Sequence, residues 1–222
     1  MKEEVQIKSN LETIVLNSLK KASDEMEFSG ENFTEESLRY IVMKEISENG
    51  YYGTFPNRMD NKRQIQFEYN YFKGKKNPKE KFMPDIVSLE HNERLLVIEL
   101  KINRTRGSLI KDLKKCIEYL NENKGEMFDM AAMIFTIPKH KQGKEAWMFE
   151  EMLITTIREN KTLINKIHNI KNRLIIGFVE YLYDNRFRSA QYDSNDKNGK
   201  YSEPKVLWID TNVQVANSSV VS

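Results

Sequence analysis

Two carboxylates and an amine lie at a fixed spacing near the middle of the chain. Asp85 follows a proline, and the segment Glu99-Leu100-Lys101 ends a run of apolar residues. Carboxylate oxygens are the ligands that Mg²⁺ prefers, and a bound divalent ion can turn a water into a nucleophile and neutralise charge on a phosphate. A neighbouring lysine can hold that water or stabilise the transition state. These residue types therefore predict metal-dependent hydrolysis of phosphodiester bonds.

The two acids are predicted to meet through a β-hairpin. Residues 82–90 and 95–101 have strand composition, and the polar residues 91–93 between them are turn-like. A three-residue loop pairs Glu90 with Arg94, an opposite-charge pair, and places Asp85 opposite Glu99 with Lys101 following on the same face. The same register aligns the apolar pairs Leu89 with Leu95 and Val87 with Val97. A loop of two or four residues would put the acids on opposite faces unless a bulge restored the register.

The elements around the hairpin indicate an α/β fold. Helices are expected over residues 3–27, 34–49, 108–121 and 144–168, and further strands over 64–72, 130–137, 174–183 and 206–213. Residues 184–204 are expected to form a loop. This order predicts a mixed central sheet with helices on its faces, because a hairpin-rich stretch is followed by a strand–helix–strand crossover.

Composition is that of one globular domain. The chain has 222 residues, of which 39% are hydrophobic and 31% charged. We expect one domain over 1–222, with an N-terminal helix in 1–30, a core in 34–138, a helix and strands in 139–213, and a flexible tail in 214–222. No apolar run approaches the roughly 20 residues of a membrane span, and no secretory segment follows the start, so a cytoplasmic location is expected. The single cysteine, Cys116, is expected to be a core residue.

The motif and the element order together resemble the PD-(D/E)XK, or restriction-endonuclease-like, nuclease superfamily. Pro84-Asp85 and Glu99-Leu100-Lys101 match its motif, and residues 34–138 match its α-β-β-β-α-β core. The resemblance implies cleavage of nucleic acid, mostly DNA, with Mg²⁺ or Mn²⁺. Asp85, Glu99 and the carbonyl of Leu100 would then bind the metal, and Lys101 would position or activate the attacking water.

Many members of that superfamily add a glutamate from the first core helix. On a helical wheel Glu35 lies close to the centre of the inward face, Glu45 lies nearer its edge and Glu36 points away. Glu35 is therefore the predicted fourth catalytic residue, although the helix dipole alone favours acids in a first turn. Glu68 on the preceding strand is a second candidate, and an ordinary solvent-facing position is the alternative for it.

Basic residues follow the motif. The stretch from Lys101 to Lys115 holds six Lys or Arg against one acid, within a chain whose net charge is only +2. The residues predicted to contact phosphates are Arg104, Arg106, Lys111, Lys114 and Lys115.

The oligomeric state is left open, with a homodimer as one possibility. Two other functions also stay open: a nuclease-like fold that only binds nucleic acid or protein, and an unrelated α/β interaction protein. The nuclease hypothesis, with a restriction, repair or defence role, leads because all three motif charges are present.

Overall fold

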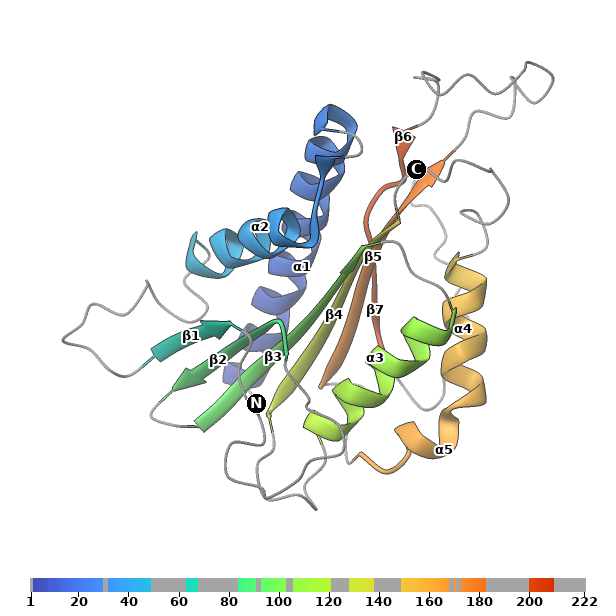
Figure 1. Ribbon diagram of the computed structural model, residues 1–222. Coiled ribbons are helices and arrows are strands. Elements are labelled where there is room, and N and C mark those ends of the chain that lie inside the picture. The colour runs from blue at the N-terminus through green and yellow to red at the C-terminus, as the bar shows by residue number, and fades with distance from the viewer. Residues whose placement is uncertain are drawn as a thin grey trace, which may run out of the picture.

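A mixed β-sheet separates two layers of helices in the computed structural model of the chain (Figure 1). The structure describes residues 2–29, 32–48, 63–67, 84–90, 93–102, 106–120, 128–137, 149–167, 170, 173–182 and 200–209. The α/β fold class predicted from the sequence is confirmed. None of the helices within these residues is long and apolar enough to cross a membrane.

Seven strands form the sheet within the described residues, in the order β1-β2-β3-β4-β5-β6, with β7 also paired to β5. Their bounds are β1 Arg63–Phe67, β2 Ile86–Glu90, β3 Glu93–Ile102, β4 Met130–Ile137, β5 Leu174–Leu182, β6 Lys200–Tyr201 and β7 Lys205–Trp208. Strands β3, β4 and β5 are parallel neighbours, whereas β1 and β2 on one side and β6 and β7 on the other pair antiparallel. Parallel strands need cover on both faces, which the two helical layers provide.

Each helical layer closes its own hydrophobic core. Helices α1 (Lys2–Ser29) and α2 (Glu35–Glu48) cover one face, and α3 (Arg106–Tyr119), α4 (Phe149–Glu159) and α5 (Lys161–Ile164) cover the other (Figure 1). The predicted inward stripe of α1 is confirmed, because all its members are fully buried: Leu11, Ile14, Val15, Leu19 and Ala22. The side-chain alternation of β3 divides its residues between these cores, with Val97 towards α3 and Ile98 towards α1.

The hairpin between β2 and β3 has the predicted register at the end away from its loop, but a register shift within the hairpin produces it. Val87 pairs with Val97, as predicted, and Ile86 pairs with Ile98. The predicted pairings nearer the loop are wrong, because a register shift between Ser88 and Leu89 aligns Leu89 with Arg94 and Glu90 with Glu93. A bulge adds one residue to one of the two paired strands. Beyond the bulge, the strands therefore pair as they would if the loop were one residue longer.

Two predictions in the C-terminal half are also wrong. The single helix expected over 144–168 is divided into α4 and α5 at Asn160, and residues 144–148 lie outside the described ranges. Asn160 leaves helical geometry, its side-chain amide donates to the carbonyl of Thr156, and its own carbonyl accepts the N–H groups of Leu163 and Ile164. An asparagine that bonds locally in this way competes with the helix ladder. The expected loop 184–204 contains strand β6, which pairs with Tyr181 and Leu182.

Helix α1 packs closely on β5 because residue 177 is a glycine. A Cβ atom at Gly177 would overlap the Cγ1 methyl of Val15 and lie 3.0 Å from Cδ1 of Leu19. Valine has a restricted χ1 angle, so its methyl group cannot easily turn away. The glycine therefore sets the distance between α1 and the sheet.

We expect Gly177→Ala to destabilise the protein by about 1–3 kcal/mol, because it overpacks this contact. The measurement is the free energy of unfolding in denaturant. Val15→Ala provides the matched control: it costs stability by itself but removes the overlapping methyl. The double variant Val15→Ala/Gly177→Ala should then be more stable than the sum of the single effects predicts. Strict additivity would contradict a direct clash between the two positions.

Candidate active site

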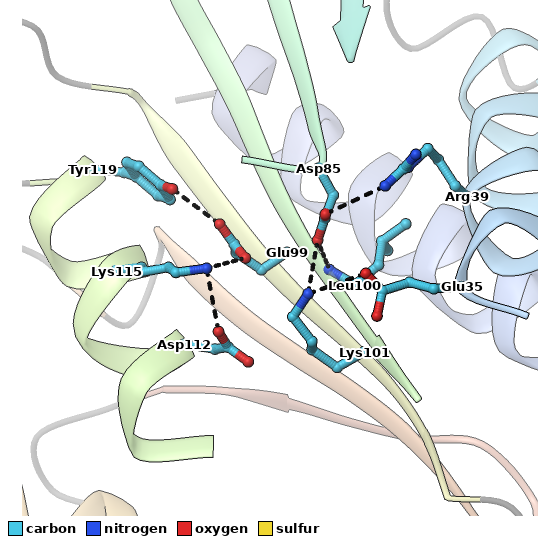
Figure 2. A network of polar contacts seen from close by, with 9 residues as sticks. All are labelled: Glu35, Arg39, Asp85, Glu99, Leu100, Lys101, Asp112, Lys115 and Tyr119. Carbon is cyan, nitrogen blue, oxygen red and sulfur yellow. Dashed lines mark hydrogen bonds and ion pairs between the residues drawn. The ribbon is translucent and has the colours of Figure 1, made fainter. Parts of the chain in front are cut away.

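Asp85 is tied to the neighbouring strand by its side chain. One carboxylate oxygen, Oδ2, accepts a 2.7 Å hydrogen bond from the backbone N–H of Leu100, and Lys101 Nζ lies 3.5 Å from the same oxygen. The guanidinium of Arg39, on α2, lies 3.5 Å from the other oxygen (Figure 2). The residue is only 8% exposed. The last strand pair is Ile86 with Ile98, and continuing this antiparallel register by one residue places Asp85 opposite Glu99.

Lys101 joins Asp85 to the first turn of α2. Its ammonium lies 3.1 Å from Oε1 of Glu35 as well as beside Asp85 (Figure 2). Thr34 begins this helix, because its hydroxyl accepts the N–H of Ser37 and its carbonyl accepts the N–H of Leu38. The N-cap thus fixes Glu35 as the first residue of α2, at the end of the helix nearest to Lys101.

The other acids considered for this position lie elsewhere. Glu45 is buried and forms an ion pair with Lys21 of α1. Glu36 is exposed, and Glu68 lies outside the described residues. Among these candidates Glu35 is the acid that the structure connects to Asp85 through Lys101, as its helical phase predicts.

Glu99 is fully buried and held from the opposite side, by α3. The hydroxyl of Tyr119 donates a 2.9 Å hydrogen bond to Oε1, and the ammonium of Lys115 donates a 3.1 Å hydrogen bond to Oε2 (Figure 2). Burial raises the pKa of Glu99 to about 7; the charge of Lys115 pulls it down and that of Asp85 pushes it up. Asp85 and Glu99 are therefore close enough to interact electrostatically.

Lys115 lies between two buried carboxylates. Its ammonium is 3.4 Å from Oδ1 of Asp112, one helical turn away on α3, as well as bonded to Glu99. Burial lowers the pKa of Lys115, but the charges of Glu99 and Asp112 and the hydrogen bonds to them together more than offset this effect, so the pKa lies above its usual value. Lys115 was predicted to contact phosphate from the polar side of α3; its ammonium instead lies against Glu99 and Asp112.

The remaining predicted phosphate contacts are only partly placed. Lys111 and Lys114 are exposed on α3. Arg104 lies outside the described residues, and Arg106 is the first residue of α3 but its side chain is not described. Their role in binding nucleic acid stays a prediction.

Three polar residues of this network were missed from the sequence: Arg39, Asp112 and Tyr119. Helical spacing carries a signal for each of them. Arg39 is four residues after Glu35, and Tyr119 is four residues after Lys115, so each lies on the same helix face as a predicted site residue. Asp112 precedes Lys115 by three residues, which is the other spacing at which helix side chains meet.

The donor set fits a magnesium ion better than a metal that needs an all-protein cage. Within the described part of the chain, no three His, Cys, Asp or Glu residues are grouped to hold a metal ion. Mg²⁺ usually keeps several waters and takes one or two carboxylates from the protein. Asp85 and Glu99 can supply two, and Glu99 is a buried carboxylate that a cation would stabilise.

Comparisons with known proteins do not identify a family for this chain. No family model and no curated protein matches the chain. Among solved structures, a match is NucC of P. aeruginosa in its cAAA-bound form, at 10% identity and a TM-score of 0.32, covering 87% of this chain and 84% of that one. A TM-score this low does not establish a common fold, so the function must be inferred from the site itself.

The raised pKa of Glu99 predicts a pH-dependent stability. The folded protein binds this proton with a pKa of about 7, against an ordinary glutamate pKa of 4.5. Between these pH values the folded state binds more protons than the unfolded state, so this group makes stability fall as pH rises to about 7. Glu99→Gln, which is always neutral, should lack this loss, which is on the order of 3 kcal/mol.

The measurement is the free energy of unfolding of both proteins against pH, in EDTA. The difference between them removes the contribution of the other titrating groups. A difference that stays constant over this range would show that Glu99 ionises normally in the folded protein.

Proposed function

We propose that the chain is a metal-dependent nuclease of the PD-(D/E)XK type, which hydrolyses phosphodiester bonds of nucleic acid, with DNA as the expected substrate. The observation that carries the proposal is the meeting of the motif residues at one end of β3. Asp85 contacts both the backbone of Leu100 and the ammonium of Lys101, next to the buried Glu99. Asp85 thus meets residues that are 14 or more positions away in the sequence in one polar cluster at the sheet.

The proposed metal ligands are Asp85, Glu99 and the carbonyl of Leu100, with Mg²⁺ or Mn²⁺ as the ion. A divalent ion held there would activate water and neutralise charge on the phosphate. The hydrogen bond from Leu100 N–H orients the carboxylate of Asp85. Tyr119 does the same for Glu99. Such supporting contacts to ligands commonly tune metal affinity.

Lys101 is the proposed group for holding the attacking water and stabilising the transition state. Glu35 holds the Lys101 ammonium from α2, at 3.1 Å, and only 13% of the Lys101 side chain is exposed. A lysine held on two sides is preorganised, which is what electrostatic stabilisation of a transition state requires. Glu35 is thus proposed as a residue of the catalytic site that acts on Lys101.

One observation favours a second candidate, a nuclease-like fold that binds nucleic acid without cleaving it. Both proposed metal-binding carboxylates already have internal cations, Arg39 and Lys101 at Asp85 and Lys115 at Glu99. A site whose carboxylates are already paired with side-chain cations could remain without a metal ion. Cleavage assays separate the two functions.

We expect Asp85→Asn to abolish metal binding and cleavage, because it replaces a charged oxygen ligand. Lys101→Ala should retain metal binding but lose about 10²–10³ in cleavage rate, because its role is in the transition state. The measurements are cleavage of mixed DNA and RNA with Mg²⁺, Mn²⁺ or EDTA, and metal binding by calorimetry. Lys44→Ala, on the exposed side of α2, is the matched control.

A wild-type protein that binds nucleic acid but cleaves none of these substrates would establish the binding function instead. A protein that neither binds nor cleaves would leave the motif without a nucleic-acid role.

The exposed lysines of α3 are proposed to contact the phosphate backbone. Replacing both Lys111 and Lys114 by Gln should weaken DNA binding and reduce the slope of log affinity against log salt by about one per lost contact. The measurement is fluorescence anisotropy with labelled DNA at several salt concentrations, with Ca²⁺ in place of Mg²⁺. Replacing Lys20 and Lys44, exposed on α1 and α2, is the control with equal charge loss. Equal slopes for both double variants would mean that α3 makes no specific contact.

A further inference from the structure

Lys115 bridges two buried carboxylates on the α3 side of the site. Its ammonium lies 3.1 Å from Oε2 of Glu99 and 3.4 Å from Oδ1 of Asp112, and these acids are 0% and 3% exposed (Figure 2). The ammonium of Lys115 therefore already has two carboxylates with which it can pair. One of them, Glu99, is a proposed metal ligand, whereas Asp112 has no part in the metal site.

Asp112 has an unused acceptor. Its second oxygen, Oδ2, is buried and has no hydrogen-bond partner among the described residues. Leaving a buried charged oxygen without a donor is unfavourable. The vacant acceptor is explained if a donor occupies it in another state of the site. Among the described residues, Lys115 is a cation that contacts Asp112, through the other oxygen, Oδ1.

A divalent ion on Glu99 would repel the ammonium that is now bonded to the same carboxylate. Lys115 can respond without a movement of the backbone, because Asp112 is one turn away on the same helix and the lysine side chain has several rotatable bonds. Tyr119 holds the other Glu99 oxygen, so the carboxylate keeps one orienting contact when Lys115 leaves.

We propose that Lys115 is a displaceable counter-cation of Glu99, and that Asp112 receives its ammonium when a divalent ion binds. The proposal rests on the metal site of the proposed function. No proton is transferred and no bond is broken; the ammonium moves from a shared position to full pairing with Asp112. Asp112 is thus a positioning residue that sets metal affinity through Lys115.

The test measures Mn²⁺ affinity by electron paramagnetic resonance of free Mn²⁺, without nucleic acid, in the wild type and three variants. Lys115→Met removes the competing charge and should tighten Mn²⁺ binding on the order of tenfold. Asp112→Asn leaves the ammonium without its anionic alternative and should weaken binding by a similar factor. Lys44→Met is the control for loss of a lysine outside the site, and thermal unfolding in EDTA verifies folding of each variant.

The double variant Lys115→Met/Asp112→Asn decides the mechanism. Because Asp112 acts through Lys115, its replacement should have almost no further effect once Lys115 is gone. An equal loss from Asp112→Asn in both backgrounds would mean that Asp112 attracts the ion directly, and the proposal would be wrong. Weaker binding by Lys115→Met would make Lys115 a fixed clamp on Glu99, which also overturns it.

Three further outcomes are distinguished. If Lys115→Met does not fold, Lys115→Gln removes the charge, keeps a donor for Glu99 and carries the same expectation. If the wild type binds no Mn²⁺, the metal site of the proposed function fails, and the displacement of Lys115 fails with it. Metal binding with an unaltered effect of Asp112 in the double variant would overturn the displacement alone.

Discussion

The burial of the Glu99 carboxylate is the constraint on which the site depends. A carboxylate with no exposed surface, in a strand between two hydrophobic cores, must be paired and hydrogen-bonded to be tolerated. Tyr119 and Lys115 meet this need from α3, and they can do so only if the helix crosses β3 in one rotational setting. The ring of Tyr119 also packs edge-to-face on Phe128, at a centroid distance of 6.1 Å, which holds the phenol in place. The polar contact and the apolar packing of α3 therefore fix each other.

Asp85 connects this arrangement to the hairpin and to the other helical layer. Its hydrogen bond from Leu100 N–H needs β2 and β3 in the observed register, and its contact with Arg39 needs α2 beside them. Glu99 is paired with Lys115 of α3, whereas Lys101, two residues further along β3, is paired with Glu35 of α2. The end of β3 is thus the place where both layers deliver polar side chains to the sheet.

The parts that the sequence predicts are those governed by local periodicity. Helical phase places the stripe of α1 and selects Glu35 over Glu45, and strand alternation aligns Val87 with Val97. The bulge beyond Ser88 and the helix break at Asn160 escape the sequence, and at Asn160 the reason is one local side-chain bond that competes with the helix ladder. Lys115 escapes for another reason. A helical wheel shows which side it lies on, but its partner Glu99 is supplied by a different element.

Charge balance explains why metal and substrate binding should be linked at such a site. Counted over the residues that the structure describes, and without an ion, the cluster holds four carboxylates, Glu35, Asp85, Glu99 and Asp112, against three cations, Arg39, Lys101 and Lys115. With Glu99 ionised, negative charge is in excess, which favours a cation and disfavours a phosphate. A divalent ion would reverse the sign of that excess and so favour the phosphodiester backbone. Because binding free energies are reciprocal, a bound phosphate would strengthen metal binding by the same factor. The internal cations would then keep the buried acids compatible with the fold until both ligands are present.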